Sequence, residues 1–394
     1  MFRVFVNAAR SIGLSDRLLR VLQVTNSLNF GGLERLVVDL ALGLDRNRFE
    51  PMVACLKYKG NLAPELEAAG VPVFALNADV DPRRRYRTFR GLQRLIREHR
   101  VDVVHTHNTG PLIDTLLARL TQWRGVRVVH TDHTRPHWPD KRKYMWAEYL
   151  ASFWVRSLVA VSEEARDKLV EYEGIHRHWI QLIDNGIDVG RFLVPEDARQ
   201  AMLAELDATG FDQCVGVIAM HRQQKGITHL LQAVPAILEA CPNTGFLLGG
   251  GGPLEEAHQE EARALGISEH VRFLGRRSDV PNLLSTFDVY VLPSESEGLP
   301  IGLLEAMAAN RPIVATAVGA VPRVLNEGAC GRLVEPGVPK ALATAVIELL
   351  QDRVTAQALA DAARERVAAD FSIQRTTQDY QRLYRQAAGQ RIEP

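Results

Sequence analysis

Two glutamates, Glu297 and Glu305, flank a turn rich in glycine and proline, Glu-Gly-Leu-Pro-Ile-Gly-Leu-Leu-Glu. The pattern predicts a buried strand over 288–292, a loop over 294–302 and a helix from Leu303 onward. Backbone N–H groups at a helix N-terminus, with the positive end of the helix dipole, suit a diphosphate. Carboxylates accept hydrogen bonds from vicinal hydroxyls, at about 1.5–3 kcal/mol per charged bond. The spacing therefore favours a ligand that carries both phosphate and sugar hydroxyls.

A second interpretation of these residues stays open, in which Glu297 caps the helix and Glu305 is a solvated acid of its first turn. In the ligand interpretation, the glycines of the turn let the ligand approach the backbone closely. The backbone contacts would come from Gly298, Leu299, Pro300, Ile301, Gly302 and Leu303.

Two cations lie in a loop after the first strand of the second half of the chain. Lys225 would place a point charge on the diphosphate, and Arg222 would add a bidentate contact. The alternative is that both are exposed loop cations.

Near the N-terminus, Gly31 and Gly32 follow the first strand and precede a helix, where backbone can approach a phosphate or a sugar. A tight connection without a ligand explains them equally well.

Histidines crowd the ends of two strands in the first half. They are His105, His107, His130, His133 and His137. Their spacing matches no zinc signature well, and strand-end histidines are often polar loop residues, so we expect no metal.

The composition is that of a globular protein. The 394 residues are 46% apolar and 24% charged, which allows two domains of ordinary size. Lys+Arg and Asp+Glu are equal at 47 each, so no overall field favours nucleic acid. Four widely spaced cysteines and no membrane-spanning run predict a cytoplasmic location.

Short apolar runs alternate with helical stretches twice along the chain. The first series contains runs at 21–25, 52–56, 71–75, 101–105, 127–130 and 158–161, and the second contains runs at 214–218, 245–248, 271–274, 289–292 and 312–315. This predicts an α/β protein with two parallel, doubly wound, Rossmann-like sheets. We expect domains at 1–188, with residues 1–19 an extension, and at 189–371, followed by a C-terminal segment 372–394.

The segment Glu-Gly-Leu-Pro-Ile-Gly-Leu-Leu-Glu-Ala-Met-Ala, followed by Pro-Ile-Val-Ala-Thr, closely resembles the donor-binding segment of glycosyltransferase family 4. The Gly-Gly-Leu-Glu sequence at 31–34, the Lys225-Gly226 pair and Val-Arg-Phe-Leu-Gly-Arg at 271–276 are also similar. The family typically has an arginine where this chain has Met220. The resemblance covers roughly 21–384 and is more specific in the second half.

This resemblance implies a retaining enzyme of the GT-B fold, whose two domains face a cleft and whose C-terminal helix returns to the first domain. It implies that Glu297 holds the donor sugar, Glu305 the ribose, and Gly275 and Arg276 the base. Lys225 would stabilise the leaving diphosphate, and His133 would orient a donor or acceptor hydroxyl. The enzyme would need no cofactor or metal.

The implied partners are a nucleotide-diphosphate sugar and a glycan or lipid-linked acceptor, as in the synthesis of polysaccharides or lipopolysaccharides. Two alternatives stay open, a nucleotide-sugar epimerase of similar fold and a non-catalytic sugar-nucleotide-binding protein. The basic, partly apolar segments 83–100 and 138–154 predict peripheral contact with the inner face of the membrane. Alternatively, their apolar stripes pack inward.

Overall fold

The computed structural model describes residues 17–29, 31–76, 88–120, 125–133 and 142–390, without the side chains of 142–144. The chain forms two compact units. Unit 1 extends to Val161, resumes for Ala165–Ile183 and takes the chain from Thr376 onward, whereas unit 2 holds Ser162–Glu164 and Asp184–Arg375. The predicted extension, 1–19, lies mostly outside the described residues.

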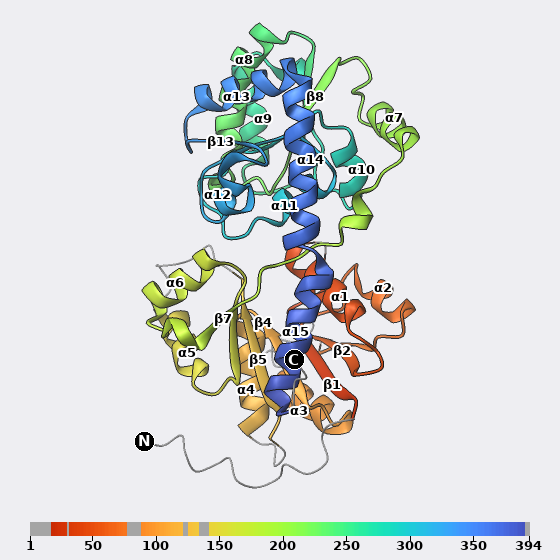
Figure 1. Ribbon diagram of the computed structural model, residues 1–394, viewed down its shortest axis with the longest axis vertical. Helices are drawn as coiled ribbons and strands as arrows, with labels where there is room; N and C mark the ends of the chain where they lie inside the picture. The colour runs from red at the N-terminus through yellow and green to blue at the C-terminus, as the bar shows by residue number, and fades with distance from the viewer. Residues whose placement is uncertain (1–16, 30, 77–87, 121–124, 134–141, 391–394) are drawn as a thin grey trace. The chain divides into compact units, whose positions relative to one another are not determined.

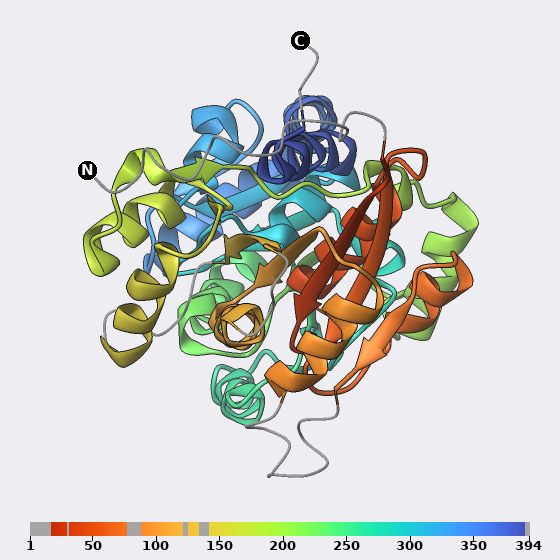
Figure 2. The same cartoon turned by 90° about the horizontal axis from the view of Figure 1, so that it is seen from below.

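Unit 1 contains a parallel sheet in which seven described strands follow the order β3-β2-β1-β4-β5-β6-β7 (Figures 1 and 2). The strands are β1 Leu19–Thr25, β2 Phe49–Cys55, β3 Val73–Ala75, β4 Val103–His107, β5 Arg127–Asp132, β6 Ser157–Ala160 and β7 Ile180–Leu182. The helices between them are α1 Gly32–Gly43, α2 Ala63–Ala68, α3 Thr88–Glu98, α4 Thr109–Leu120, α5 Arg142–Ser152 and α6 Glu163–Glu173. The order reverses between β1 and β4, as in doubly wound folds.

Unit 2 repeats this plan with six described strands in the order β10-β9-β8-β11-β12-β13. They are β8 Gln213–Ile218, β9 Thr244–Gly249, β10 Val271–Phe273, β11 Val289–Leu292, β12 Ile313–Thr316 and β13 Arg332–Val334. Its described α-helices are α7 Glu196–Glu205, α8 Ile227–Ala240, α9 Glu255–Ala264, α10 Val280–Ser285, α11 Ile301–Ala308, α12 Val321–Val324, α13 Pro339–Gln351 and α14 Arg353–Asp370. The predicted class of two Rossmann-like parallel sheets is confirmed.

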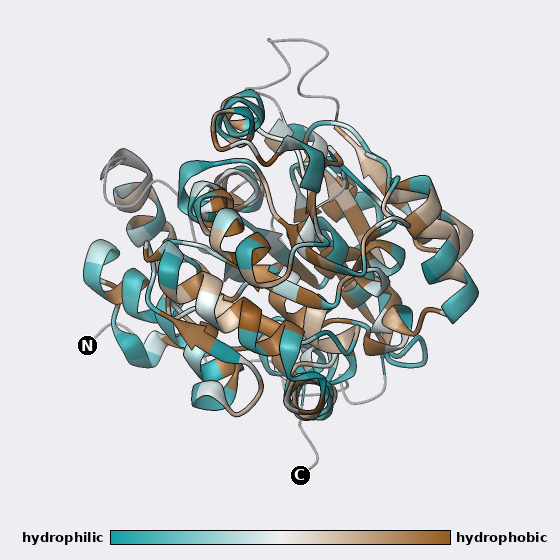
Figure 3. Cartoon of the chain, turned by 90° about the horizontal axis from the view of Figure 1, so that it is seen from above, coloured by the Kyte–Doolittle hydropathy of each residue, from teal (hydrophilic) through white to brown (hydrophobic). Residues whose placement is uncertain are grey.

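The central strands are buried along most of their length because helices cover both faces of each sheet. In β11 all four residues, Val289–Leu292, are buried. Figure 3 shows that strands and helices differ in hydropathy. The strands are largely brown, and the helices carry brown and teal residues together. An amphipathic helix buries only one stripe, which is why the covering helices mix the two kinds of residue.

Each sheet has one edge strand beyond those predicted. β7 and β13 are three residues long and lie at the end of their sheets. β13 is half-buried throughout, whereas β7 has one buried, one exposed and one half-buried residue. A short edge strand packs on few neighbours, so its sequence carries little apolar signal.

The helix after the Glu297 turn also differs from expectation, since α11 begins at Ile301 and not at Leu303.

The two segments that connect the units are hydrogen-bonded to each other. The Ile187 N–H donates to the Phe371 carbonyl at 2.9 Å, and the Ile373 N–H donates to the Ile187 carbonyl at 2.8 Å. These bonds hold both segments within unit 2. Consequently, the chain enters unit 2 at Asp184 and leaves it after Arg375, whereas the sequence pattern places these changes at 188 and 371.

The C-terminal helix α15, Ile373–Ala388, returns to unit 1 as expected. Its Tyr380, Leu383 and Tyr384 complete a buried apolar cluster with residues of β1, β4 and β5. Two of these side chains also carry polar bonds. The Tyr384 hydroxyl lies 2.7 Å from His105 Nδ1, and the Tyr380 hydroxyl lies 2.9 Å from Thr131 Oγ1. Thr131 Oγ1 in turn lies 2.7 Å from His105 Nε2, so α15 and two strands share one buried network.

The apolar stripe of α3 packs inward. Leu92, Leu95 and Ile96 are buried in a core cluster with residues of β1, β2 and β4. Phe89 packs against the same cluster and is partly exposed, and residues 83–87 lie outside the described residues. None of the described helices is long and apolar enough to cross a membrane.

Replacing Tyr384 by Phe should destabilise unit 1. The change removes the hydroxyl and leaves a ring nitrogen of the fully buried His105 without its partner, at an expected cost of about 1–3 kcal/mol. Urea unfolding followed by circular dichroism measures this loss. The control is Tyr58→Phe, because Tyr58 is 44% exposed and its hydroxyl accepts from Asn29 at the surface. Equal stability of the two variants would contradict the importance of the buried network.

Candidate active site

The candidate donor site lies after the carboxyl ends of β8 and β11, where the strand order of unit 2 reverses. In open parallel sheets, ligands bind at this switch point. Lys225 comes from the short 3₁₀ helix after β8, and Glu297 comes from the loop after β11. The Lys225 Nζ donates to Glu297 Oε1 at 2.7 Å, and the Ser294 hydroxyl donates to the same oxygen at 2.6 Å. Sequence positions 72 residues apart thus meet in one ion pair.

Close backbone contacts bring these two loops together. Gly226 has φ +61°, and a Cβ on it would lie 2.0 Å from the Pro293 carbonyl oxygen. Only glycine fits such a contact without displacement of the backbone. Beside it, the Glu295 N–H donates to the Gln224 carbonyl at 2.9 Å. The glycine after Lys225 therefore sets the distance between the lysine loop and the glutamate loop.

A third loop, after β12, holds the other side of the Glu297 turn. Gly319 has φ +52°, and a Cβ there would lie 2.1 Å from the Glu297 carbonyl oxygen. The Ala320 N–H donates to the Gly298 carbonyl at 3.2 Å, and the Thr316 hydroxyl donates to the Ser294 carbonyl at 2.5 Å. Loops of unit 2 thus hold the turn from two sides.

The interpretation of Glu297 as a helix cap is wrong. The N-cap of α11 is Pro300, without a side-chain cap, and Glu297 bonds Lys225 and Ser294 instead. The expected anion-binding N–H groups also shift, because the Leu303 N–H already donates to the Pro300 carbonyl at 3.1 Å. The helix start that can meet an anion is at Ile301 and Gly302. Leu299 and Leu303 are buried, so their side chains support the turn.

Tyr290, on β11, lies beneath this turn and was missed by the sequence analysis. Its side chain is fully buried, and a Cβ on Gly302 would lie 2.9 Å from its hydroxyl. Burial raises the pKa of Tyr290, and the negative charges of Glu305 and Glu297 raise it further. Both glutamates therefore act electrostatically on one hydroxyl. An apolar strand with a single tyrosine gives no signal for this position, because aromatic residues are common in buried strands.

The remaining predicted donor residues lie on neighbouring loops of unit 2. Arg222 and Arg276 are exposed, and Gly275 bonds the glycine-rich turn through its carbonyl, which accepts from the Gly250 N–H at 2.7 Å. A Cβ on Gly251 would meet the Arg276 Cγ at 3.2 Å, so this arginine lies along that turn.

A buried histidine pair supports the same turn. His221 Nδ1 and His258 Nδ1 are 3.0 Å apart, and Phe273 lies against the His221 ring. Burial lowers the pKa of both rings, which favours the neutral pair, although Glu255 and Glu261 act in the opposite direction on His221 and His258 respectively. One neutral ring can donate while the other accepts.

In unit 1, the predicted glycines Gly31 and Gly32 stand at the start of α1. Gly31 is the N-cap residue in an extended conformation, and the Arg35 N–H donates to its carbonyl at 2.9 Å. The Glu34 carboxylate folds back over it, since a Cβ on Gly31 would lie 2.3 Å from Glu34 Oε2. Burial raises the pKa of Glu34, and a backbone hydrogen bond opposes the shift.

His133 follows β5 and contacts His107 of β4, with His133 Nε2 and His107 Nδ1 3.1 Å apart. His107 Nε2 lies 3.2 Å from Gln23 Oε1. Because that oxygen only accepts, His107 donates from Nε2, and its Nδ1 then accepts from His133 Nε2. Burial and nearby histidines lower the pKa of His107 well below its usual range, which keeps the ring neutral. Gln23 and His107 thus orient the His133 ring so that its Nε2 donates to His107.

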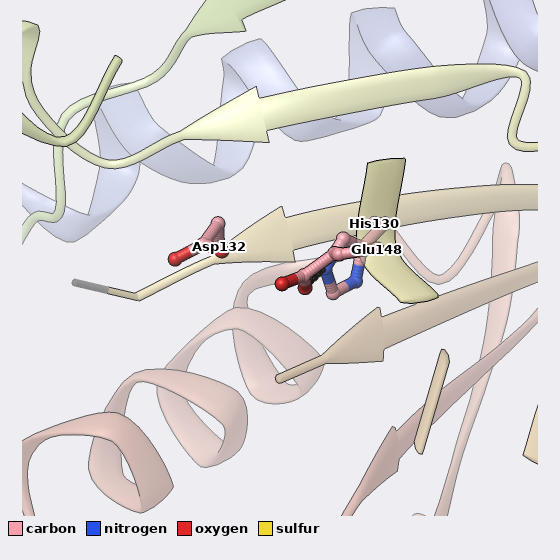
Figure 4. Close-up of side chains that lie close together, drawn as sticks. All are labelled: His130, Asp132 and Glu148. Carbon is pink, nitrogen blue, oxygen red and sulfur yellow. Dashed lines mark hydrogen bonds and ion pairs between the residues drawn. The ribbon is translucent and has the colours of Figure 1, made fainter. Parts of the chain in front are cut away.

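Three further side chains of unit 1 converge in a way the sequence did not predict (Figure 4). His130, Asp132 and Glu148 are all buried, and one donor atom from each lies within 4.8 Å of the others. His130 Nε2 and Glu148 Oε1 are 3.1 Å apart.

His137, the last of the histidines noted in the sequence, lies outside the described residues.

Two doubly wound sheets, with a lysine and two carboxylates at the switch point of the second, define a two-domain α/β protein of the GT-B fold. Residues 30–191 match the family model "Glycosyltransferase Family 4", and residues 213–352 match "Glycosyl transferases group 1". The chain belongs to the family 4 glycosyltransferases. This confirms the expectation of a glycosyltransferase that uses a nucleotide sugar.

Individual proteins are similar over most of their length. An Escherichia coli UDP-Gal:alpha-D-GlcNAc-diphosphoundecaprenol alpha-1,3-galactosyltransferase is 26% identical over 307 residues, 74% of this chain and 77% of that protein. The structure of Anabaena HepE in complex with UDP and glucose superposes with a TM-score of 0.80 at 20% identity, covering 93% of this chain and 99% of that one. A glycosyltransferase from Rickettsia africae ESF-5 gives 0.79 at 22% identity, covering 94% and 98%. These structures share the fold.

Replacing Gly226 by Ala should destabilise unit 2 more than replacing Gly266. Both glycines have positive φ, +61° and +69°, but a Cβ on Gly266 meets nothing within 4 Å. The left-handed backbone costs an alanine about 1–2 kcal/mol at either position. Contact with the Pro293 carbonyl should add about 1–3 kcal/mol at Gly226 alone. Denaturant unfolding measures the difference, and equal losses would show that the loops are not held by this contact.

Proposed function

We propose that this glycosyltransferase takes a sugar from a nucleoside diphosphate sugar held by unit 2 and passes it to a hydroxyl acceptor. The observation that carries the proposal is the Lys225–Glu297 pair at the switch point of the second sheet, held by glycine contacts on both sides. A preorganised cation and carboxylate need little rearrangement when a ligand binds, which is the condition for efficient electrostatic catalysis.

The diphosphate would bind between Lys225 and the start of α11. Lys225 would exchange its bond to Glu297 for a phosphate oxygen, and the N–H groups of Ile301 and Gly302 would donate to the same anion. Arg222 is exposed beside this lysine loop and would add a second cation. These groups stabilise the negative charge that grows on the leaving diphosphate. In this proposal no metal ion is needed at the phosphates.

The two glutamates would hold hydroxyls. Both hydrogen bonds described for Glu297 end on Oε1, so Oε2 can accept from the donor sugar. Glu305, half-buried in α11, would accept from the ribose, and Gly275 with Arg276 would border the base. Charged acceptors of this kind contribute about 1.5–3 kcal/mol per bond.

We propose retention at the anomeric carbon, by attack on the same face from which the diphosphate leaves. In this proposal Glu297 holds a hydroxyl of the donor sugar, and no residue of the protein acts as a nucleophile. The leaving phosphate would take the acceptor proton. His133, oriented by its bond to His107, would orient a hydroxyl from unit 1, and Gly31 and Gly32 would let the ligand approach α1.

A lipid-linked acceptor at the membrane surface is the second part of the proposal. The similar galactosyltransferase acts, by its name, on a GlcNAc-diphosphoundecaprenol acceptor. In this chain α5 and the two residues after it expose Trp146, Leu150, Phe153 and Trp154, which are 65%, 51%, 50% and 58% accessible. Indole rings favour the headgroup region of bilayers. The sequence also places Lys141, Arg142 and Lys143 at the start of this segment, where anionic lipids would attract them.

Replacing Glu297 by Gln, or Lys225 by Met, should lower transfer about 10- to 100-fold. Each change removes one charged hydrogen bond, worth about 1.5–3 kcal/mol in the transition state. The donor is first chosen by a thermal-shift screen of nucleotide sugars. Release of the nucleoside diphosphate and formation of a glycoside are then measured together, and the anomeric configuration of the product is read by NMR.

The matched control for this experiment is Glu295→Gln. Glu295 belongs to the same loop but is 41% exposed and pairs with His229, so its change should leave transfer within threefold, about 0.65 kcal/mol. Parental turnover in Glu297→Gln would reject the assigned site. Inversion in the product would reject the proposed mechanism alone.

Replacing Leu150 by Ser should weaken binding to vesicles of anionic phospholipid. The side chain lies on the exposed apolar face of α5, and its burial in lipid would contribute about 1.5–3 kcal/mol. Leu193→Ser is the control, because Leu193 is 60% exposed but belongs to unit 2. Cosedimentation with vesicles measures both variants. Equal binding of the two would contradict a membrane contact through α5.

A further inference from the structure

The cluster of His130, Asp132 and Glu148 is built from two adjoining elements of unit 1 (Figure 4). His130 and Asp132 are alternate residues of β5, so both side chains project from the same face of the sheet. Glu148 comes from α5, and its carboxylate lies close to the His130 ring. The His130 and Glu148 side chains are each 1% exposed, and Asp132 is fully buried. One nitrogen and two oxygen donors therefore converge in the interior.

The imidazole is held in one tautomer. His130 Nδ1 lies 2.9 Å from the Thr106 hydroxyl oxygen and 3.1 Å from the Thr106 carbonyl oxygen. The hydroxyl can donate or accept, but the carbonyl can only accept, so the bond to the carbonyl places a hydrogen on Nδ1. In the neutral ring, the lone pair is then on Nε2, which faces Glu148 Oε1. Two acceptors at 3.1 Å need a positive charge between them or a proton on one of them. A backbone carbonyl that fixes the second ring nitrogen is also the usual support of a histidine that ligates a metal.

We propose that this cluster binds a divalent transition-metal cation, with zinc or manganese as the first candidates. A neutral imidazole with two carboxylates carries a charge of −2, which one divalent ion neutralises. Imidazole suits zinc and carboxylates suit manganese, so a site with one imidazole and two carboxylates can bind either metal. The 3.1 Å between Nε2 and Oε1 is close to the separation of about 3.3 Å between two tetrahedral zinc ligands. Asp132, within 4.8 Å, supplies the third ligand.

The proposed ion is structural and is independent of the donor site. Its ligands belong to β5 and α5 of unit 1, whereas the donor residues Lys225, Glu297 and Glu305 belong to unit 2. The ion would join α5, which carries the exposed aromatic residues, to the sheet. The donor phosphates would still be neutralised by protein groups alone.

The first measurement is the metal content of the complete, untagged chain. The protein is produced in medium supplemented with zinc and manganese, dialysed, and analysed by inductively coupled plasma mass spectrometry. The expected result is about one ion per chain. X-ray absorption of that ion should show nitrogen and oxygen neighbours with one imidazole. No bound transition metal, or an ion with sulfur neighbours, would overturn the proposal, and His130 and Glu148 would then share a proton.

Variants locate the ion. Glu148→Gln and His130→Gln should each lower the affinity for zinc or manganese about 100-fold or more, since even changes outside the ligand set cost 10- to 100-fold. Glu173→Gln is the control, because Glu173 is a buried glutamate of the same unit outside the cluster. Undiminished metal binding in both ligand variants would also overturn the proposal. If the variants do not fold, the absorption spectrum of the parent decides. None of these readouts depends on transferase activity.

Discussion

The candidate donor site depends on how closely three backbone loops approach one another in unit 2. Gly226 lies against the Pro293 carbonyl and Gly319 against the Glu297 carbonyl, and no other residue fits at these distances with positive φ. These contacts place Lys225 on Glu297. The pair is partly desolvated, with 23% and 7% of the side chains exposed. Because desolvation offsets much of the attraction, the pair contributes more to geometry than to stability.

In unit 1, a buried hydrogen-bond network holds the strand ends together. Tyr384, His105, Thr131 and Tyr380 are fully buried and form one chain of hydrogen bonds across strand ends. Such a network is stable only when all of its members are satisfied, because an unpaired polar group in the interior is costly. The returning helix α15 supplies two of these members. Unit 1 therefore needs the C-terminus of the chain to complete its own interior.

The sequence predicted the alternating strands and helices of both units, and it predicted candidate site residues in the loops after the strands. Apolar runs between turn residues located the buried strands. The resemblance in the 293–316 segment indicated Glu297, and the Lys225-Gly226 pair after the first strand of the second half indicated Lys225. The sequence did not predict β7 and β13, which are short edge strands, or the start of α11 at Ile301. It also missed Tyr290, Gln23 and Glu148. These contacts join positions distant in the chain, and a single sequence contains no record of which distant side chains meet.

Electrostatic attraction of a ligand to this protein must be local. Lys+Arg and Asp+Glu are equal in number, so the whole chain presents no net field to a doubly charged diphosphate. Attraction must come from a cation that is already in position. Glu297 holds Lys225 in that position and neutralises it, so the site is not an open positive pocket that any anion would fill. A ligand gains both partners only if it brings phosphate for the lysine and hydroxyls for the glutamate. The ion pair thus selects for a molecule with both groups, and a bare anion would have to separate the charges without satisfying Glu297.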